Sequence, residues 1–160
     1  MQKTILLLLT FSIFIACNNK ASTEATAEDT LVDETELLPE ERLSWMTVYD
    51  TTRNMVVLLK QREVDSNNLT PQSVISDINA TWENIKLEFR KVSNDTLYVA
   101  IPHSDYLTQQ MGSSGSSEYL ASATFNLTEI KGVRFVNYDF HEGDHLSPGT
   151  FSRDSFKEFR

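Results

Sequence analysis

The chain has 160 residues, of which 40% are hydrophobic, 10% aromatic and 23% charged, a composition typical of a one-domain globular protein with short appendages. Its formal net charge of −9 argues against a nucleic-acid-binding protein, because affinity for phosphates requires a basic surface. A single cysteine excludes an internal disulfide and a thiolate zinc cluster, since each needs at least two.

The first residues have the pattern of a secretory signal peptide. A short polar start with Lys3 leads into an apolar run from Ile5 to Ala16, which is too short to cross a bilayer comfortably. The run ends at Cys17, the only cysteine, and this arrangement resembles the lipobox of bacterial lipoproteins. The resemblance implies that residues 1–16 are removed and that Cys17 carries a palmitate-bearing lipid. The alternative is an ordinary signal peptide with an incidental cysteine.

The residue after the cysteine bears on localisation. Asn18 is not the aspartate that, by resemblance to Gram-negative lipoproteins, retains a protein in the inner membrane. We therefore expect the cell envelope, with lipid anchoring in the outer membrane where the cell has two membranes.

Residues 17–41 are expected to form an acidic tether. They contain no aromatic residue, and they hold eight acidic side chains against the single Lys20. Such a segment buries too little apolar surface to offset its ordering entropy, so we expect a disordered spacer. Residues 42–160 hold 12 basic and 15 acidic side chains and form the predicted domain.

The first half of the domain shows two strand pairs around a helix. Residues 45–49 and 55–59 predict a hairpin, whose second strand is expected to be buried on both faces. A threonine cap and a first-turn proline predict a helix over 71–83. Alternating apolar residues over 85–90 and 97–101 predict a second hairpin.

The second half of the domain completes an α+β pattern. Apolar residues from Leu120 to Ile130 have helical spacing, and Gly132 is expected to end this second helix. A last strand is expected over 133–140, and the tail from Pro148 carries aromatic residues suited to packing back on the domain. The β-β-α-β-β-α-β order predicts a two-layer α+β sandwich: one mostly antiparallel sheet of about five strands, with two helices on one face.

Several segments resemble the GerMN domain of bacterial sporulation and germination proteins. The matching stretches are Thr47–Tyr49, Thr70–Pro71, Asp95–Val99, Gly112–Ser117 and, most specifically, Asn126–Val133. The resemblance covers about 46–150 and implies a compact α+β domain, secreted or anchored in the envelope, with no assigned catalytic residue. The family often has two such domains in tandem, whereas this chain has one copy.

Residues 141–145 spell H-E-x-x-H, the pattern by which metalloproteases hold zinc on one face of a helix. The surroundings differ, because the pattern follows a strand, includes Gly143 and Asp144, and is soon followed by Pro148. Only His103 remains as a third nitrogen ligand. We expect a turn without a bound metal or other cofactor, and zinc catalysis or adventitious metal binding is the alternative.

The loop before the second helix is a candidate ligand or anion site. It contains Gly112, Ser113, Ser114, Gly115 and Ser116. It lacks the lysine and spacing of a P-loop and the spacing of a G-x-S-x-G elbow. Exposed N–H groups and hydroxyls at a helix entry are able to hold a carboxylate or phosphate, and plain capping is the alternative.

These patterns predict a non-enzymatic envelope lipoprotein that contacts the membrane through its lipid and binds an envelope protein or a second copy of itself. A second hypothesis is a ligand-binding lipoprotein using the loop 102–117, with Tyr106 and Met111 as an apolar lip. A zinc hydrolase using residues 141–145 is the third. A concave pocket lined by the loop favours the second hypothesis, and a flat exposed strip favours a protein partner.

Overall fold

The computed structural model describes residues 38–160 of the chain. Cys17, the predicted signal peptide and most of the predicted tether lie outside the described residues, so they stay predictions. The elements are α1 (Pro39–Arg42), β1 (Trp45–Asp50), β2 (Met55–Lys60), α2 (Pro71–Thr81), β3 (Glu88–Ser93), β4 (Thr96–Ile101), the π-helix η1 (Tyr106–Gln110), α3 (Gly112–Leu127), β5 (Phe135–Phe140), β6 (Gly149–Phe151) and the 3-10 helix η2 (Arg153–Phe159). Within this described part, no helix is long and apolar enough to cross a membrane.

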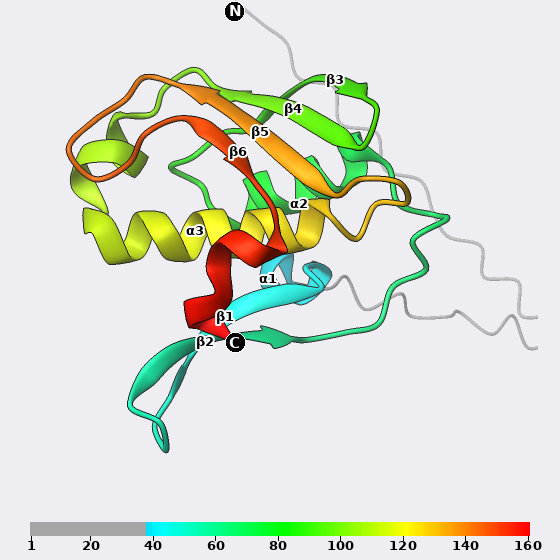
Figure 1. The fold of residues 1–160 in the computed structure, drawn as a ribbon. Helices are drawn as coiled ribbons and strands as arrows, with labels where there is room; N and C mark the ends of the chain where they lie inside the picture. The colour runs from blue at the N-terminus through cyan, green and yellow to red at the C-terminus, as the bar shows by residue number, and fades with distance from the viewer. Residues whose placement is uncertain (1–37) are drawn as a thin grey trace, which may run out of the picture. The chain divides into compact units, whose positions relative to one another are not determined.

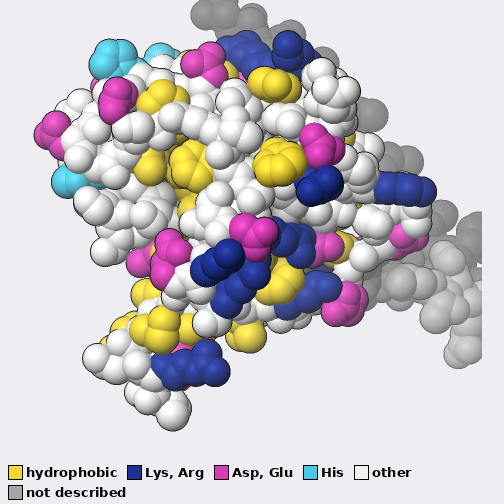
Figure 2. Space-filling model, in the orientation of Figure 1, with side chains coloured by type: hydrophobic (Ala, Val, Ile, Leu, Met, Phe, Trp, Pro, Cys, Tyr) yellow, Lys and Arg dark blue, Asp and Glu magenta, His cyan; other side chains and the backbone are white. Residues whose placement is uncertain are grey.

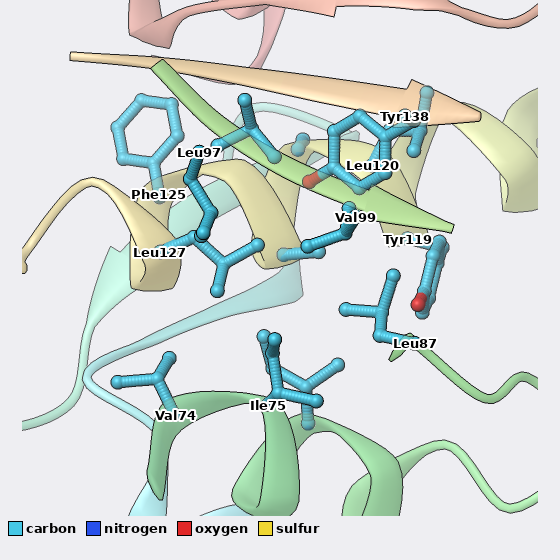
Figure 3. Packing of buried hydrophobic residues seen from close by; sticks show 14 of the residues in the cluster. Val74, Ile75, Leu87, Leu97, Val99, Tyr119, Leu120, Phe125, Leu127 and Tyr138 are labelled. Atoms are coloured by element: carbon cyan, nitrogen blue, oxygen red, sulfur yellow. The ribbon is translucent and has the colours of Figure 1, made fainter. Parts of the chain in front are cut away.

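A four-stranded sheet and two helices form the main body of the domain. The sheet has the order β3-β4-β5-β6, and α2 and α3 lie along one of its faces (Figure 1). Alternate residues of the two central strands point towards the helices, and two of them, Val99 and Tyr138, are at most 1% exposed (Figure 3). The predicted α+β class, with helices layered on one face of a sheet, is confirmed.

Strands β1 and β2 form a separate hairpin instead of joining the main sheet. The expectation of a single sheet was therefore wrong in this detail. The reason lies at the base of β1, where the outward N–H and C=O groups of Trp45 bond to side chains of α3 rather than to another strand. The hairpin thus packs beneath α3, on the side away from the main sheet (Figure 1).

The central strand pair of the main sheet is parallel. Thr96 of β4 is paired with Phe135 of β5 and Ile101 with Phe140, whereas β3–β4 and β5–β6 are antiparallel. The mostly antiparallel sheet expected from the sequence thus has a parallel pair at its centre. Helix α3 is the cause, because it connects β4 to β5 as a crossover. It carries the chain back to the end of the sheet at which β4 begins, so β5 runs in the same direction as β4.

Two element boundaries differ from the sequence expectation. Ile85 and Leu87 alternate as strand residues would, yet they are buried in the connection before β3, where Asn79 of α2 bonds both backbone groups of Leu87 at 2.7 and 2.9 Å. Helix α3 ends at Leu127 rather than at Gly132. The hydrogen bonds from Asn79 therefore delay the start of β3, and a short turn ends α3 early. Neither feature shows in the periodicity of the sequence.

Burial of the predicted hairpin also differs from expectation. Leu59 and Met55 of β2 are 50% and 37% exposed, so the prediction of a strand buried on both faces was wrong. The predicted packing of the tail is confirmed, because β6 extends the sheet and Phe156 and Phe159 of η2 are buried.

One hydrophobic core lies between the sheet and the two helices. Leu97 and Val99 of β4 meet Leu120 and Leu127 of α3, and Ile75 of α2 approaches them from the opposite side (Figure 3). All five side chains are at most 6% exposed. This core leaves the loops at the ends of β4 and β5, and most of the hairpin, as the surfaces available for function.

Candidate functional site

The carboxyl ends of β4 and β5 bring together the two segments singled out in the sequence. Because Ile101 and Phe140 are paired in a parallel register, the loops that follow them start side by side. The Ser104 hydroxyl donates to the His141 carbonyl at 3.0 Å, and the His145 amide donates to the Thr108 carbonyl at 3.0 Å. This edge of a parallel sheet is where α/β proteins commonly place ligand sites.

The segment Gly112–Ser116 is the first turn of α3, but η1 runs directly into it. Gly112 has a φ of +70°, a conformation that glycine adopts without strain and that separates the two helices. Ser116 is fully buried, and its hydroxyl donates to the carbonyls of Leu107 and Gly112. Gly115 lies against Met111, where a Cβ atom would come within 3.2 Å of the methionine Cβ. These residues therefore have structural roles in joining η1 to α3.

The exposed hydroxyls of this turn belong to Ser113 and Ser114. Ser113 Oγ lies 3.3 Å from Nδ1 of His145. A side-chain contact thus joins the first turn of α3 to the H-E-x-x-H segment. A catalytic serine–histidine pair also needs a group that orients the other ring nitrogen. In the described part of the chain no carboxylate bonds His145, and anion binding by this turn remains a prediction.

The H-E-x-x-H segment is an irregular loop between β5 and β6, not a helix. His141 Nδ1 lies 2.8 Å from the Glu142 carbonyl, and the Glu142 carboxylate accepts from Ser147. At Gly143 a Cβ atom would lie 2.6 Å from Thr108 Oγ1, so the loop packs on η1 too closely for a side chain there. Residues 38–160 contain no group of three or more histidine, cysteine or acidic side chains suited to a metal ion.

Replacing His141 by alanine is expected to change the free energy of unfolding by less than about 0.5 kcal/mol, because the exposed ring is bonded only to the neighbouring carbonyl. We also expect no stoichiometric zinc in protein purified without added metal. Denaturant unfolding and elemental analysis measure the two quantities. Tight zinc that disappears with His141→Ala would restore the metal-site interpretation.

Sequence reasoning missed a cluster that joins β1, the end of α3 and η2. Glu129 accepts from the Trp45 indole N–H at 2.7 Å and from the Arg153 guanidinium at 2.8 Å. Arg153 also donates to Thr128 Oγ1 and to the Phe125 carbonyl, and it lies over the rings of Trp45 and Phe125. Figure 2 shows basic side chains gathered over η2 in this region. Trp45, Glu129 and Arg153 are 24 to 108 positions apart in the chain, so no local pattern reveals their contact.

The electrostatics of this cluster favour a charged glutamate. Partial burial acts to raise the pKa of Glu129, but the hydrogen bonds from Trp45 and Arg153 and the Arg153 charge outweigh it, and the pKa lies below its ordinary value. A carboxyl group whose pKa is lower in the folded protein than in the unfolded chain stabilises the fold at every pH above its pKa in the unfolded chain. This stabilisation is lost as the pH falls towards and below its pKa in the folded protein. The cluster thus acts as a clamp that holds at neutral pH and weakens in acid, as the Glu129 carboxylate takes up a proton.

The clamp fixes the base of the hairpin, whereas its outer part is exposed. Tyr49, Leu59 and Met55 are 58%, 50% and 37% exposed, and Figure 2 shows hydrophobic side chains over the projecting hairpin. Leu59 shares one face of the hairpin, which we call the hairpin face, with Met46, Val48, Asp50, Met55 and Val57, so the face is apolar except for Asp50 next to the turn. An apolar surface on a firmly held base is suited to binding a protein.

The hairpin also has open edges. The Gln61 amide donates to the Ser44 carbonyl, and the alternation of an antiparallel pair then directs the backbone groups of Thr47, Tyr49, Val56 and Leu58 outward. Among the described residues no third strand pairs with the hairpin. Its backbone is therefore available to an added strand.

Comparisons with known proteins add a structural likeness. No family model matches the chain, and no curated protein matches it significantly. The solved structure of the tandem GerMN domains of the sporulation protein GerM from Bacillus subtilis is similar over 69% of this chain and 46% of that one, with a TM-score of 0.44 and 10% identity. The chain thus spans less than half the length of that structure.

Proposed function

We propose that this protein is a non-enzymatic lipoprotein of the cell envelope, with one GerMN-like domain that binds another protein at the membrane surface. The anchoring part of the proposal rests on the signal-peptide pattern that ends at Cys17. The GerMN assignment rests on the sequence resemblance, chiefly over Asn126–Val133.

The exposed hairpin is the observation that supports binding of another protein. Its hairpin face presents apolar side chains around Leu59, and its edges present unpaired backbone groups. A partner that adds an extended strand satisfies those groups and covers alternate apolar side chains at the same time. The exposed apolar area is modest, which supports a weak complex that forms where the protein is concentrated on a membrane.

The residues 102–117 give less support to the ligand-binding alternative than expected. Met111 packs against the core instead of forming a lip. Tyr106 does line a hollow, together with the end of α2.

Site-specific crosslinking tests the protein contact. A photo-crosslinking amino acid at Met55 of the full-length protein is expected to give a product of discrete mass in membranes, because Met55 lies on the hairpin face. The added change Leu59→Glu is expected to abolish that product, since a buried carboxylate opposes an apolar contact. Mass spectrometry of the product identifies either a second copy or another envelope protein.

A matched control is Val92 of β3, which is 45% exposed and lies on the main sheet. A crosslinker at Val92 is expected to give no specific product. Equal products from Met55 and Val92, or a Met55 product unaffected by Leu59→Glu, would contradict the proposal. Leu59→Glu alone is expected to leave stability within about 1 kcal/mol, because the side chain is half exposed.

A further inference from the structure

The edges of the main sheet are protected against pairing with another chain. Edge strand β3 has a bulge between Phe89 and Lys91, and it also carries the charged side chains of Glu88 and Arg90. The opposite edge strand, β6, spans only three residues and directly follows Pro148. Bulges, charges, prolines and short length are features by which proteins prevent an edge strand from pairing with a neighbour.

Strand β2 lacks these features. Its sequence MVVLLK has one charge, at its last residue Lys60, and it pairs with β1 without a bulge. Because β1 is the strand that contacts α3, β2 is the outer strand of the hairpin (Figure 1). Alternation along the pair directs the backbone groups of Val56, Leu58 and Lys60 to this outer edge. Helix η2 meets the hairpin on a face rather than at this edge, where Arg153 lies over the Trp45 ring.

The residues of β2 fit a second copy of the same strand. In an antiparallel pair centred on Leu58, the outward backbone groups of Val56 face those of Lys60 of the second copy. Val57 then lies opposite Leu59 of the second copy, so the hairpin faces of two copies join into one apolar surface. A twofold axis makes each of these contacts occur twice.

The same register also places opposite charges together. Arg53 lies in the turn before β2 and Glu63 lies beyond its end, with side chains 61% and 87% exposed. Within one copy they are at opposite ends of the strand, where Arg53 pairs with Asp50 and Glu63 pairs with Lys60. Both are five positions from Leu58, so the register brings Arg53 of each copy near Glu63 of the other.

We propose that the partner of the hairpin is a second copy of this chain, joined through β2 in an antiparallel pair centred on Leu58. This inference rests on the protein contact proposed above and names its partner. The pairing extends two hairpins into one continuous sheet across a twofold axis. The contact area of two short strands is small, so the dimer forms where lipid anchoring concentrates the chain and not in dilute solution.

Disulfide formation between two differently tagged full-length chains in membranes tests the register. One chain carries Val57→Cys and the other Leu59→Cys, whose Cα atoms are expected to be about 4.5 Å apart, within the range of a disulfide. Mild oxidation is expected to give mainly the mixed dimer, because like positions are separated by about 7–8 Å across the axis.

Two controls accompany this experiment. The unaltered chain, whose single cysteine is Cys17, and a chain with Val92→Cys on the exposed strand β3 are expected to give no disulfide-linked dimer. The absence of the mixed dimer, or equal yields of mixed and like dimers, would overturn the proposal.

Charge reversal tests the ends of the contact. Arg53→Glu and Glu63→Arg are each expected to lower the yield of mixed dimer about fivefold, because like charges then meet at both ends. The double variant is expected to restore the yield, although the pairs with Asp50 and Lys60 within one copy stay broken. A double variant as weak as the single ones would contradict the register. A Met55 photo-crosslink that contains only a different envelope protein would overturn the second copy as partner and leave the proposed protein contact standing.

Discussion

Replacing Cys17 by serine is expected to abolish incorporation of labelled palmitate and to move the protein from the membrane fraction to the soluble one. The physical reason is that each methylene of an acyl chain buried in a bilayer contributes about 0.8 kcal/mol to membrane binding. The apolar run before Cys17 is too short to hold the chain across a bilayer by itself. Metabolic labelling and fractionation measure the two effects.

A conservative change in the apolar run provides the control for this experiment. Thr10→Ser keeps the run and the cysteine, and it is expected to leave labelling and fractionation unchanged. An unaltered protein that takes up no palmitate, or a Cys17→Ser protein that still takes it up, would contradict lipid attachment at this residue. The alternative of an ordinary signal peptide predicts the first of these results.

Asn126→Ala is expected to lower the free energy of unfolding by about 3 kcal/mol. Asn126 is 2% exposed, and its Oδ1 accepts from the backbone amides of Ser44 and Trp45 at 2.8 and 3.1 Å. Its Nδ2 donates to the carbonyls of Trp45 and Ser122, both at 2.8 Å. Alanine leaves the two amides without an acceptor where β1 meets α3, so the hairpin loses its attachment.

Denaturant unfolding in the Cys17→Ser background measures this loss. Asn137→Ala is the matched control, because the Asn137 amide makes one exposed bond to Thr150, and we expect a cost of no more than about 1 kcal/mol. Trp45 fluorescence adds a local readout, since a detached hairpin exposes the indole to water. Equal effects of the two substitutions would show that Asn126 does not hold the hairpin.

Elements specified by neighbouring residues were predictable from the sequence. Thr70 caps α2 by accepting from the Ser73 amide at 3.1 Å, as the Thr70–Pro71 pair predicts. The turn between β1 and β2 likewise has local causes, because Asp50 accepts from the amides of Thr52 and Arg53. The context of residues 141–145 also correctly predicted a loop in place of a zinc-binding helix.

Features that depend on distant residues were not predictable in this way. The sheet arrangement depends on Asn126, whose side chain occupies the position of a neighbouring strand at Trp45. The acidic Glu129 resembles any exposed charge after a helix, yet it is bonded by an indole and a guanidinium from opposite ends of the domain. The hollow beside Trp82 is lined by residues 81–85 and by Tyr106, two segments that are distant in the chain.

The clamp between Trp45, Glu129 and Arg153 has a consequence for how the protein is made. Trp45 begins the first strand, whereas Arg153 lies in the last helix, so the contact closes a loop of more than a hundred residues. Contacts between such distant positions form slowly, because the entropy of loop closure opposes them. The N-terminal hairpin therefore leaves the ribosome long before the helix that secures it. During that interval the apolar residues of the hairpin lack the contacts with Glu129 and Arg153 that later secure its base, so they are open to non-native contacts.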